Sequence, residues 1–132
     1  MKVKLTIDNY TKCLCPVCPV QEKSKCIALK KANWQETRKK VGRVLEEYPF
    51  HPETYEIEMD ELEKHEIGKK HGFFKPNQKD MIELFCSKAV GKSDCSDLDS
   101  RQKCNCPDCA VWSKSGLKTA YYCMRGSSEE IE

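Results

Sequence analysis

Cysteines are the side chains of this sequence with the greatest capacity for chemistry, and there are 10 among 132 residues. Six of them form two copies of the motif Lys-Cys-x-Cys-Pro-x-Cys, at residues 12–18 and 103–109. In each copy three thiols lie close together, and the proline fixes one φ angle and removes one backbone N–H. Three clustered thiolates with a fourth from a distant position are a common ligand set for iron–sulfur clusters. The two motifs therefore predict two metal centres.

Two further cysteines follow the motifs in similar surroundings. Cys86 lies in Phe-Cys-Ser-Lys, followed by Gly-Lys-Ser, and Cys123 lies in Tyr-Cys-Met-Arg, followed by Gly-Ser. This echo predicts that each of them completes one ligand set. We therefore expect two [4Fe-4S] clusters, one on Cys13, Cys15, Cys18 and Cys86, the other on Cys104, Cys106, Cys109 and Cys123.

Other uses of the thiols stay open. Cys26 could replace Cys86 in the first set, or each distant cysteine could serve the other motif's cluster, as in two-cluster ferredoxins. Cys26 and Cys95 are otherwise left as further ligands, a redox pair or buried thiols. Zinc is the main alternative cofactor, although zinc sites usually use Cys-x2–4-Cys pairs without the extra cysteine. Zinc would imply an interaction or nucleic-acid-binding module, and a reactive thiol pair or open cluster would imply a redox enzyme or sensor.

The remaining polar residues offer little chemistry. The spacing of His51, His65 and His71 matches no helix face, and Gly91-Lys92-Ser93 lacks the first glycine of a phosphate-binding loop. We therefore predict no catalytic residues and an electron carrier rather than an enzyme.

Composition limits the class of protein. Hydrophobic residues are 39% with the cysteines included and charged residues are 33%, so the core is thin and metal staples would supplement it. No apolar run approaches the ~20 residues of a membrane span. The net charge of +2 argues against a nucleic-acid partner. The N-terminal residues lack the apolar region of a signal peptide, so we expect a cytoplasmic protein, where structural disulfides are rare.

The elements that position the motifs follow from the apolar pattern. Alternation predicts strands at residues 3–7 and 55–59, paired as a ribbon. Helices are predicted over 22–31, 34–48, 60–67, from Lys75 onward and over 111–115, with a break from Pro49 to Pro52 and a loop over 91–103. The expected fold is a small, irregular α+β domain, with short helices and a β-ribbon around two metal-cluster sites. It spans residues 1–132, divided into a first cysteine motif at 12–26, an insertion at 27–83, a second cysteine-rich part at 84–126 and a frayed polar tail at 127–132.

Charge is segregated along the insertion. Residues 30–43 are mainly basic and residues 53–66 mainly acidic. Two solvated faces that partly pair with each other explain this pattern simply. The alternative is that segment 30–43 docks a redox partner.

The stretches from Lys12 to Cys26 and from Leu84 to Gly126 resemble a cysteine-rich family of archaea, commonest in methanogens, whose function is unknown. The sequence departs from the family at Ala110, where the second motif is often followed by proline, and residues 27–83 lie largely outside the resemblance. The resemblance implies a cytoplasmic archaeal protein with iron–sulfur clusters. The expected role is electron transfer between redox partners in anaerobic archaeal metabolism.

Overall fold

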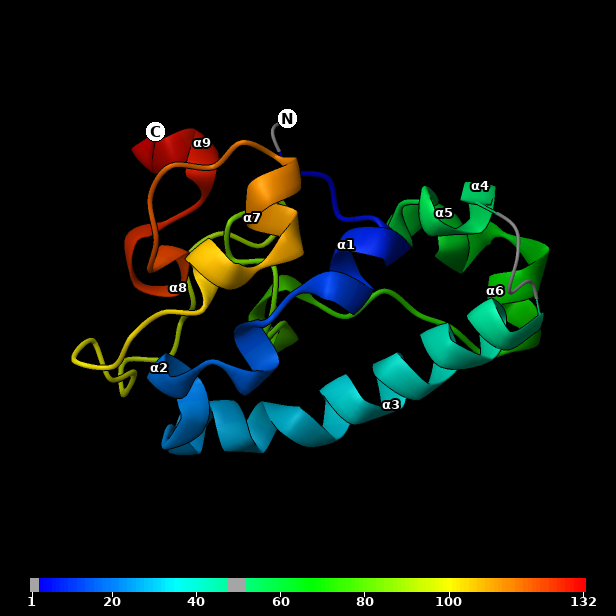
Figure 1. Cartoon of the computed structure of the whole chain (residues 1–132). Helices are drawn as coiled ribbons and strands as arrows, with labels where there is room; N and C mark the ends of the chain where they lie inside the picture. The colour runs from blue at the N-terminus through cyan, green and yellow to red at the C-terminus, as the bar shows by residue number, and fades with distance from the viewer. Residues whose placement is uncertain (1–2, 48–51) are drawn as a thin grey trace.

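Helices dominate the computed structural model, which describes residues 3–47 and 52–132. They comprise 56% of it, whereas residues in strand pairing comprise 2% and no sheet forms in these ranges (Figure 1). The predicted α+β fold is therefore wrong. The α-helices are α1 (Ile7–Lys12), α2 (Pro19–Glu22), α3 (Lys25–Glu47), α4 (Pro52–Tyr55), α5 (Met59–Lys64), α6 (Glu66–Lys70), α7 (Ala110–Lys114), α8 (Tyr122–Arg125) and α9 (Ser128–Ile131). The 3-10 helices are η1 (Cys15–Val17), η2 (Gln78–Asp80) and η3 (Cys106–Asp108).

The two segments predicted to form a β-ribbon meet at only one antiparallel bridge, between Thr6 and Glu58. Both segments then turn at once into helices, α1 and α5. Thr6 caps α1, because its Oγ1 accepts a hydrogen bond from the Asn9 N–H at 3.1 Å. The ribbon prediction fails because the alternating apolar residues lie in short linkers whose side chains enter the core.

The long helix α3 replaces the two helices predicted over 22–31 and 34–48. Nothing between Lys31 and Trp34 breaks a helix, so its 23 described residues run on without interruption along one side of the molecule (Figure 1). Ile27, Val41 and Val44 are buried and fix its inner face. Tyr48 and the predicted break at residues 49–51 lie outside the described residues.

Two other predictions are corrected. No helix begins at Lys75; the turn η2 is followed by irregular chain over 81–85, because this segment passes through the core. The tail is not frayed: it forms α9, where the Ser128 N–H and Oγ–H both donate to the Cys86 carbonyl at 2.9 Å. The helix predicted over 111–115 is confirmed as α7, the helix over 60–67 is divided into α5 and α6, and segment 91–103 is irregular as predicted.

The cysteines belong to the main hydrophobic core. Cys13, Cys18, Cys104, Cys109 and Cys123 are buried in it, and Cys15, Cys86 and Cys106 pack against it. The elements around this core are too short to bury much surface on their own. Eight free thiols are therefore part of this core, alongside aliphatic and aromatic side chains.

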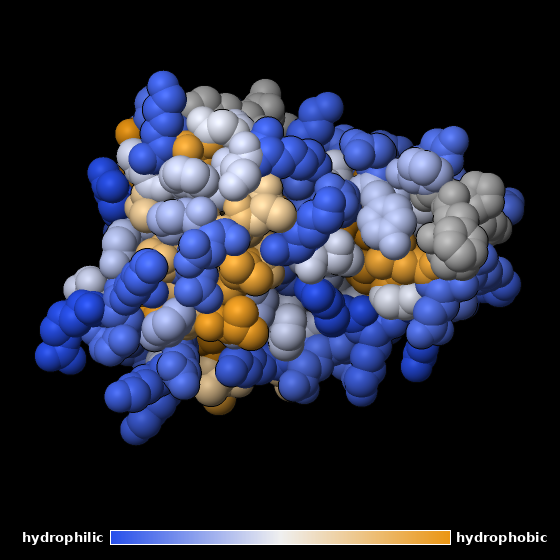
Figure 2. Space-filling view, in the orientation of Figure 1, coloured by the Kyte–Doolittle hydropathy of each residue, from blue (hydrophilic) through white to orange (hydrophobic). Residues whose placement is uncertain are grey.

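The surface is mainly polar. Figure 2 shows hydrophilic side chains over most of one face, with an apolar area over the chain between α1 and α2. Val17, in η1, is 70% exposed. No helix in the described ranges combines the length and the apolar character needed to cross a membrane.

Candidate metal centre

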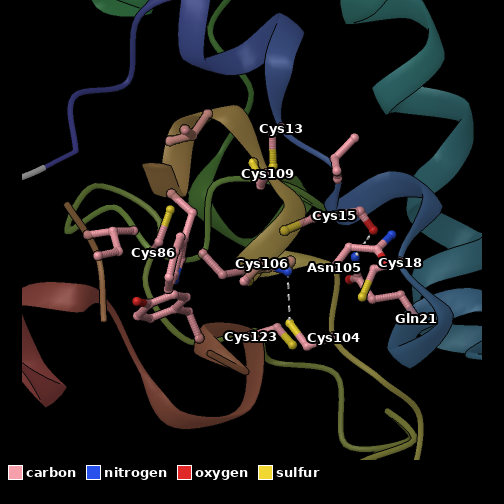
Figure 3. A pocket seen from close by; sticks show the side chains of 16 residues that line it. Cys13, Cys15, Cys18, Gln21, Cys86, Cys104, Asn105, Cys106, Cys109 and Cys123 are labelled. Atoms are coloured by element: carbon pink, nitrogen blue, oxygen red, sulfur yellow. Dashed lines mark hydrogen bonds between the residues drawn. The ribbon is translucent and has the colours of Figure 1, made fainter. Parts of the chain in front are cut away.

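The eight cysteines predicted as ligands all line one cavity (Figure 3). All are free thiols. They come from η1 and η3, from the chain just before and just after these turns, from α8 and from the loop after η2. The free space between them is only about 20 Å³. The two predicted ligand sets thus share one site instead of forming two separate ones.

The repeat in the sequence is also a repeat in the structure. In each motif the second cysteine begins a 3-10 turn, closed by a hydrogen bond from the third cysteine. The Cys18 N–H donates to Cys15 O at 3.0 Å, and the Cys109 N–H donates to Cys106 O at 2.9 Å. A short α-helix follows each third cysteine, α2 in one copy and α7 in the other. A proline suits the beginning of each 3-10 turn, because it lacks the backbone N–H that would have no partner there.

Backbone N–H groups donate to sulfur at matching positions. The Leu84 N–H donates to Cys13 Sγ at 3.3 Å, and the Tyr121 N–H donates to Cys104 Sγ. Both donors have left-handed backbone angles, with φ of 59° and 60°, which are costly for residues with a side chain. Each lies two residues before the distant cysteine of its half. The same costly conformation therefore occurs at matching positions in the two halves, and in each half it turns an amide toward the first cysteine of a motif.

The ends of the two motifs cross. Figure 3 shows Cys13 beside Cys109, and the Cys109 thiol lowers the pKa of Cys13. In the other crossing pair, the Cys18 thiol lowers the pKa of Cys104. The first cysteine of each motif therefore meets the third cysteine of the other. The backbone contacts cross in the same way, from Leu14 to Cys109 and from Asn105 to Cys18.

Burial controls the charge of the thiols. It raises the pKa of Cys86 and of Cys123 to about 12, so both hold their protons at neutral pH. Hydrogen bonds from Cys106 and Cys18 lower the pKa of Cys104, which accepts from both. A metal bound here would displace the protons and release them.

Glu83 is a buried carboxyl beside the site that sequence analysis missed. Its Oε1 accepts from Trp34 Nε1 at 2.6 Å and lies 3.8 Å from Arg38 Nη1, and the carboxyl lies close enough to Cys13 to raise the pKa of that thiol. Burial raises the pKa of Glu83 to about 8. The signal was present: Glu83 is the one charged residue in the apolar run 81–85.

Arg38 belongs to this buried arrangement and not to a free docking face. Its guanidinium donates to the Tyr10 carbonyl at 3.1 Å and lies over the rings of Tyr10 and Trp34. The predicted docking segment 30–43 therefore includes at least one residue with a structural role.

Cys26 and Cys95 do not line the cavity. They form a disulfide across 69 residues of sequence, with their Cα atoms 5.7 Å apart. Sequence analysis disfavoured disulfides, and this pair is the exception. Of the uses left open for these cysteines, a redox pair agrees best with this bond.

The residues of the cavity fit a thiolate-ligated metal group. Eight thiols suffice for two four-ligand centres, and N–H donors to sulfur stabilise the thiolate form. Four-cysteine zinc sites would use the same donors.

Comparison with known proteins places the chain in one family. A family described as "Protein of unknown function (DUF2769)" matches residues 57–124, slightly more than half of the chain. The match includes Cys86, the second motif and Cys123, and the first motif lies before it. No curated protein and no solved structure matches the chain. On the extent of the family match, this chain belongs to the DUF2769 family of proteins of unknown function.

Proposed function

We propose that this protein binds two [4Fe-4S] clusters in the eight-cysteine cavity and carries electrons between redox partners. One observation carries the proposal: eight free thiols, six from the repeated motif and two from matching positions after it, line a single cavity. Each [4Fe-4S] cluster takes four thiolates. When bound, such clusters supply one-electron oxidation and reduction.

The chain's own residues would hold the clusters and keep water away. Phe85 and Tyr122 line the cavity and are each 1% exposed, and each directly precedes a distant cysteine. With the N–H donors from Leu84 and Tyr121, they form an apolar, hydrogen-bonding surround for sulfur. Such a surround sets the reduction potential of a cluster.

The thiol contacts favour ligand sets that differ from the division by sequence. The pKa of Cys13 is shifted by the thiols of both Cys15 and Cys109, and the pKa of Cys104 by those of both Cys18 and Cys106. Cys86 and Cys123 each act on both Cys15 and Cys106. We assign Cys86 to the first group because Cys109 raises its pKa, and Cys123 to the second because Cys104 raises its pKa. The third cysteine of each motif then serves the other motif's cluster. The proposed sets are Cys13, Cys15, Cys86 and Cys109 for one cluster, and Cys18, Cys104, Cys106 and Cys123 for the other.

Paired serine variants test this crossing. In Cys18→Ser/Cys104→Ser both changes fall in one crossed set, so the variant should keep about half of the wild-type iron. In Cys13→Ser/Cys18→Ser the changes fall in two crossed sets, and both clusters should be lost. The opposite pattern, with iron kept by the second variant and lost by the first, would support the division by sequence.

Spectroscopy of protein purified without oxygen tests the function itself. We expect a brown protein whose visible absorption bleaches on reduction with dithionite and returns on reoxidation. A colourless protein that contains zinc would contradict the proposal and favour the zinc-stabilised module.

We place this function in the cytoplasm of an anaerobic archaeon. Eight of the ten cysteines are free thiols, which suits a reducing compartment. The archaeal setting is supported by the resemblance of the two motif regions to the cysteine-rich archaeal family.

A further inference from the structure

We propose that the Cys26–Cys95 disulfide is a second reactive site, which a dithiol reductant opens and which controls how firmly the cavity retains metal. The reactivity of the disulfide is argued from its own surroundings. The effect on retention rests on the proposed function. The two parts are therefore tested by separate measurements.

Access favours attack on one of the two sulfurs. Cys26 is half-buried and lies in the first turn of α3, whereas Cys95 is 7% exposed. An incoming thiolate therefore reaches Cys26 Sγ first, and Cys95 is the leaving group.

The exchange balances with a dithiol as the reductant. A thiolate of the dithiol bonds to Cys26 Sγ while the Cys26–Cys95 bond breaks, and Cys95 leaves as a thiolate that takes a proton. The second thiol of the reductant then attacks its own mixed disulfide. This attack releases the Cys26 thiolate, which also takes a proton. The pair gains two electrons and two protons, and the dithiol becomes a disulfide.

The loop that carries Cys95 connects this site to the cavity. The Cys95 N–H donates to Ser93 Oγ at 3.1 Å, and the Ser93 N–H donates to the Cys123 carbonyl at 2.8 Å. Further along the loop, the Asp99 N–H donates to the Val20 carbonyl at 2.9 Å, two residues after Cys18. The disulfide thus fastens a loop that bonds to Cys123 and to Val20, two residues after Cys18, and both cysteines belong to the same proposed crossed set.

Asp97 and Asp94 provide the other attachments of this loop to α3. The Asp97 carboxylate accepts from the Lys25 N–H at 2.8 Å and from Ser24 Oγ at 2.5 Å, and Asp94 forms an ion pair with Lys30. These polar contacts are near the surface, where water competes with them. Opening the disulfide removes the covalent attachment of the loop and leaves hydrogen bonds, the ion pair and packing, so the loop and the cavity should open more often.

Thiol counting tests the reactivity. Folded, metal-loaded wild-type protein is incubated without oxygen in dithiothreitol at graded ratios of reduced to oxidised form, then treated with a maleimide–polyethylene glycol reagent after acid quenching and unfolding. We expect two additional labelled cysteines, Cys26 and Cys95 by mass spectrometry, in one step while helical circular dichroism is unchanged. A pair that resists reduction until the helix signal is lost would overturn the proposal. Metal-free protein gives the same count, so this test holds if metal loading fails.

Metal release tests the control of the cavity. A chelator is added to the oxidised wild type, to the wild type with the pair reduced, and to Cys26→Ser/Cys95→Ser. Iron loss, or zinc loss if zinc is bound, should be roughly tenfold faster in the last two samples, because the loop opens more often. Equal release rates in oxidised and reduced wild type would overturn this part, even if the variant does not fold. Failure of the wild type to take up any metal would count against the proposed function and remove this part with it.

Discussion

Glu83 shows how a single residue is fixed beside the thiols. A buried carboxyl is tolerated only when its oxygens have partners, and Trp34 Nε1 and Arg38 supply them at Oε1. Oε2 has no hydrogen-bond partner among the described residues. Glu83 therefore fixes the Trp34 side chain next to the segment that carries Cys13. Burying the Glu83 carboxyl still costs free energy, because Oε2 is unpaired.

Replacing Glu83 separates these two effects. Glu83→Gln keeps an oxygen for Trp34, so the free energy of unfolding should change by no more than about 1 kcal/mol. Glu83→Ala leaves the Trp34 N–H unpaired and opens a cavity, and should lower the free energy of unfolding by about 2 to 4 kcal/mol. Urea unfolding under anoxia, followed by tryptophan fluorescence, measures both. Equal stability of the alanine variant and the wild type would contradict this role for Glu83.

At the scale of elements, α1 and α7 are held together next to the crossing of the motifs. Asp8 in α1 forms ion pairs with Lys114 of α7 at 2.9 Å and with Lys12 at 3.0 Å. Burial raises the pKa of Asp8, but the hydrogen bonds from Lys114 and Lys12 outweigh it and leave the pKa below its ordinary value of 3.8. The carboxylate therefore favours the folded state whenever it is charged.

The sign of this shift gives a pH dependence. Because the pKa of Asp8 is lower in the folded state, its stabilisation is present above pH 3.8 and is lost as the pH falls further. Asp8→Asn should therefore cost about 1 kcal/mol at pH 7 and much less at pH 3. Asp60→Asn is the matched control, since Asp60 pairs with Lys75 at 3.5 Å on the exposed surface and should have little effect at either pH. A pH-independent cost of Asp8→Asn would mean that its charge is not the cause.

The elements also show what the sequence could predict. The motif turns repeat because the same residues recur in them, so a repeated local structure was foreseeable from Pro16 and Pro107. The position of α7 followed from its apolar spacing. The ribbon and the helix after Lys75 were predicted wrongly. Alternation and apolar spacing indicate that side chains are buried, but irregular chain can be buried in a core as well as strands or helices. The crossing of the motifs depends on contacts between distant segments, which no local pattern encodes.

At the scale of the whole molecule, links between distant segments compensate for the thin core. The Cys26–Cys95 disulfide spans 69 residues, and loop-closure entropy assigns such a crosslink about 4 kcal/mol. The crossed ligand sets would add metal links between the first motif and the second. The disulfide and the metal links would thus each join segments that lie far apart in the sequence.

The charged side of α3 is where we expect electrostatic steering of a redox partner. Arg38 and Lys30 are held by contacts with other segments, whereas Lys39 pairs with Glu36 of the same helix at 3.6 Å and both side chains are exposed. The basic residues left for docking in segment 30–43 therefore include Lys39, Lys40 and Arg43. Reversing these three to glutamate should slow oxidation of the reduced protein by ferricyanide, an anionic acceptor, several-fold at low salt and little at high salt. Lys64→Glu/Lys69→Glu, on the surface of α5 and α6, is the control. Equal rates for both variants, measured by stopped flow, would remove α3 as the docking side.

The most direct measurement is the iron, acid-labile sulfide and zinc content per chain of protein purified and analysed without oxygen. Two [4Fe-4S] clusters predict about eight iron and eight sulfide per chain with little zinc. Stoichiometric zinc, or a protein with neither metal whose eight cavity thiols all remain free, would contradict the account.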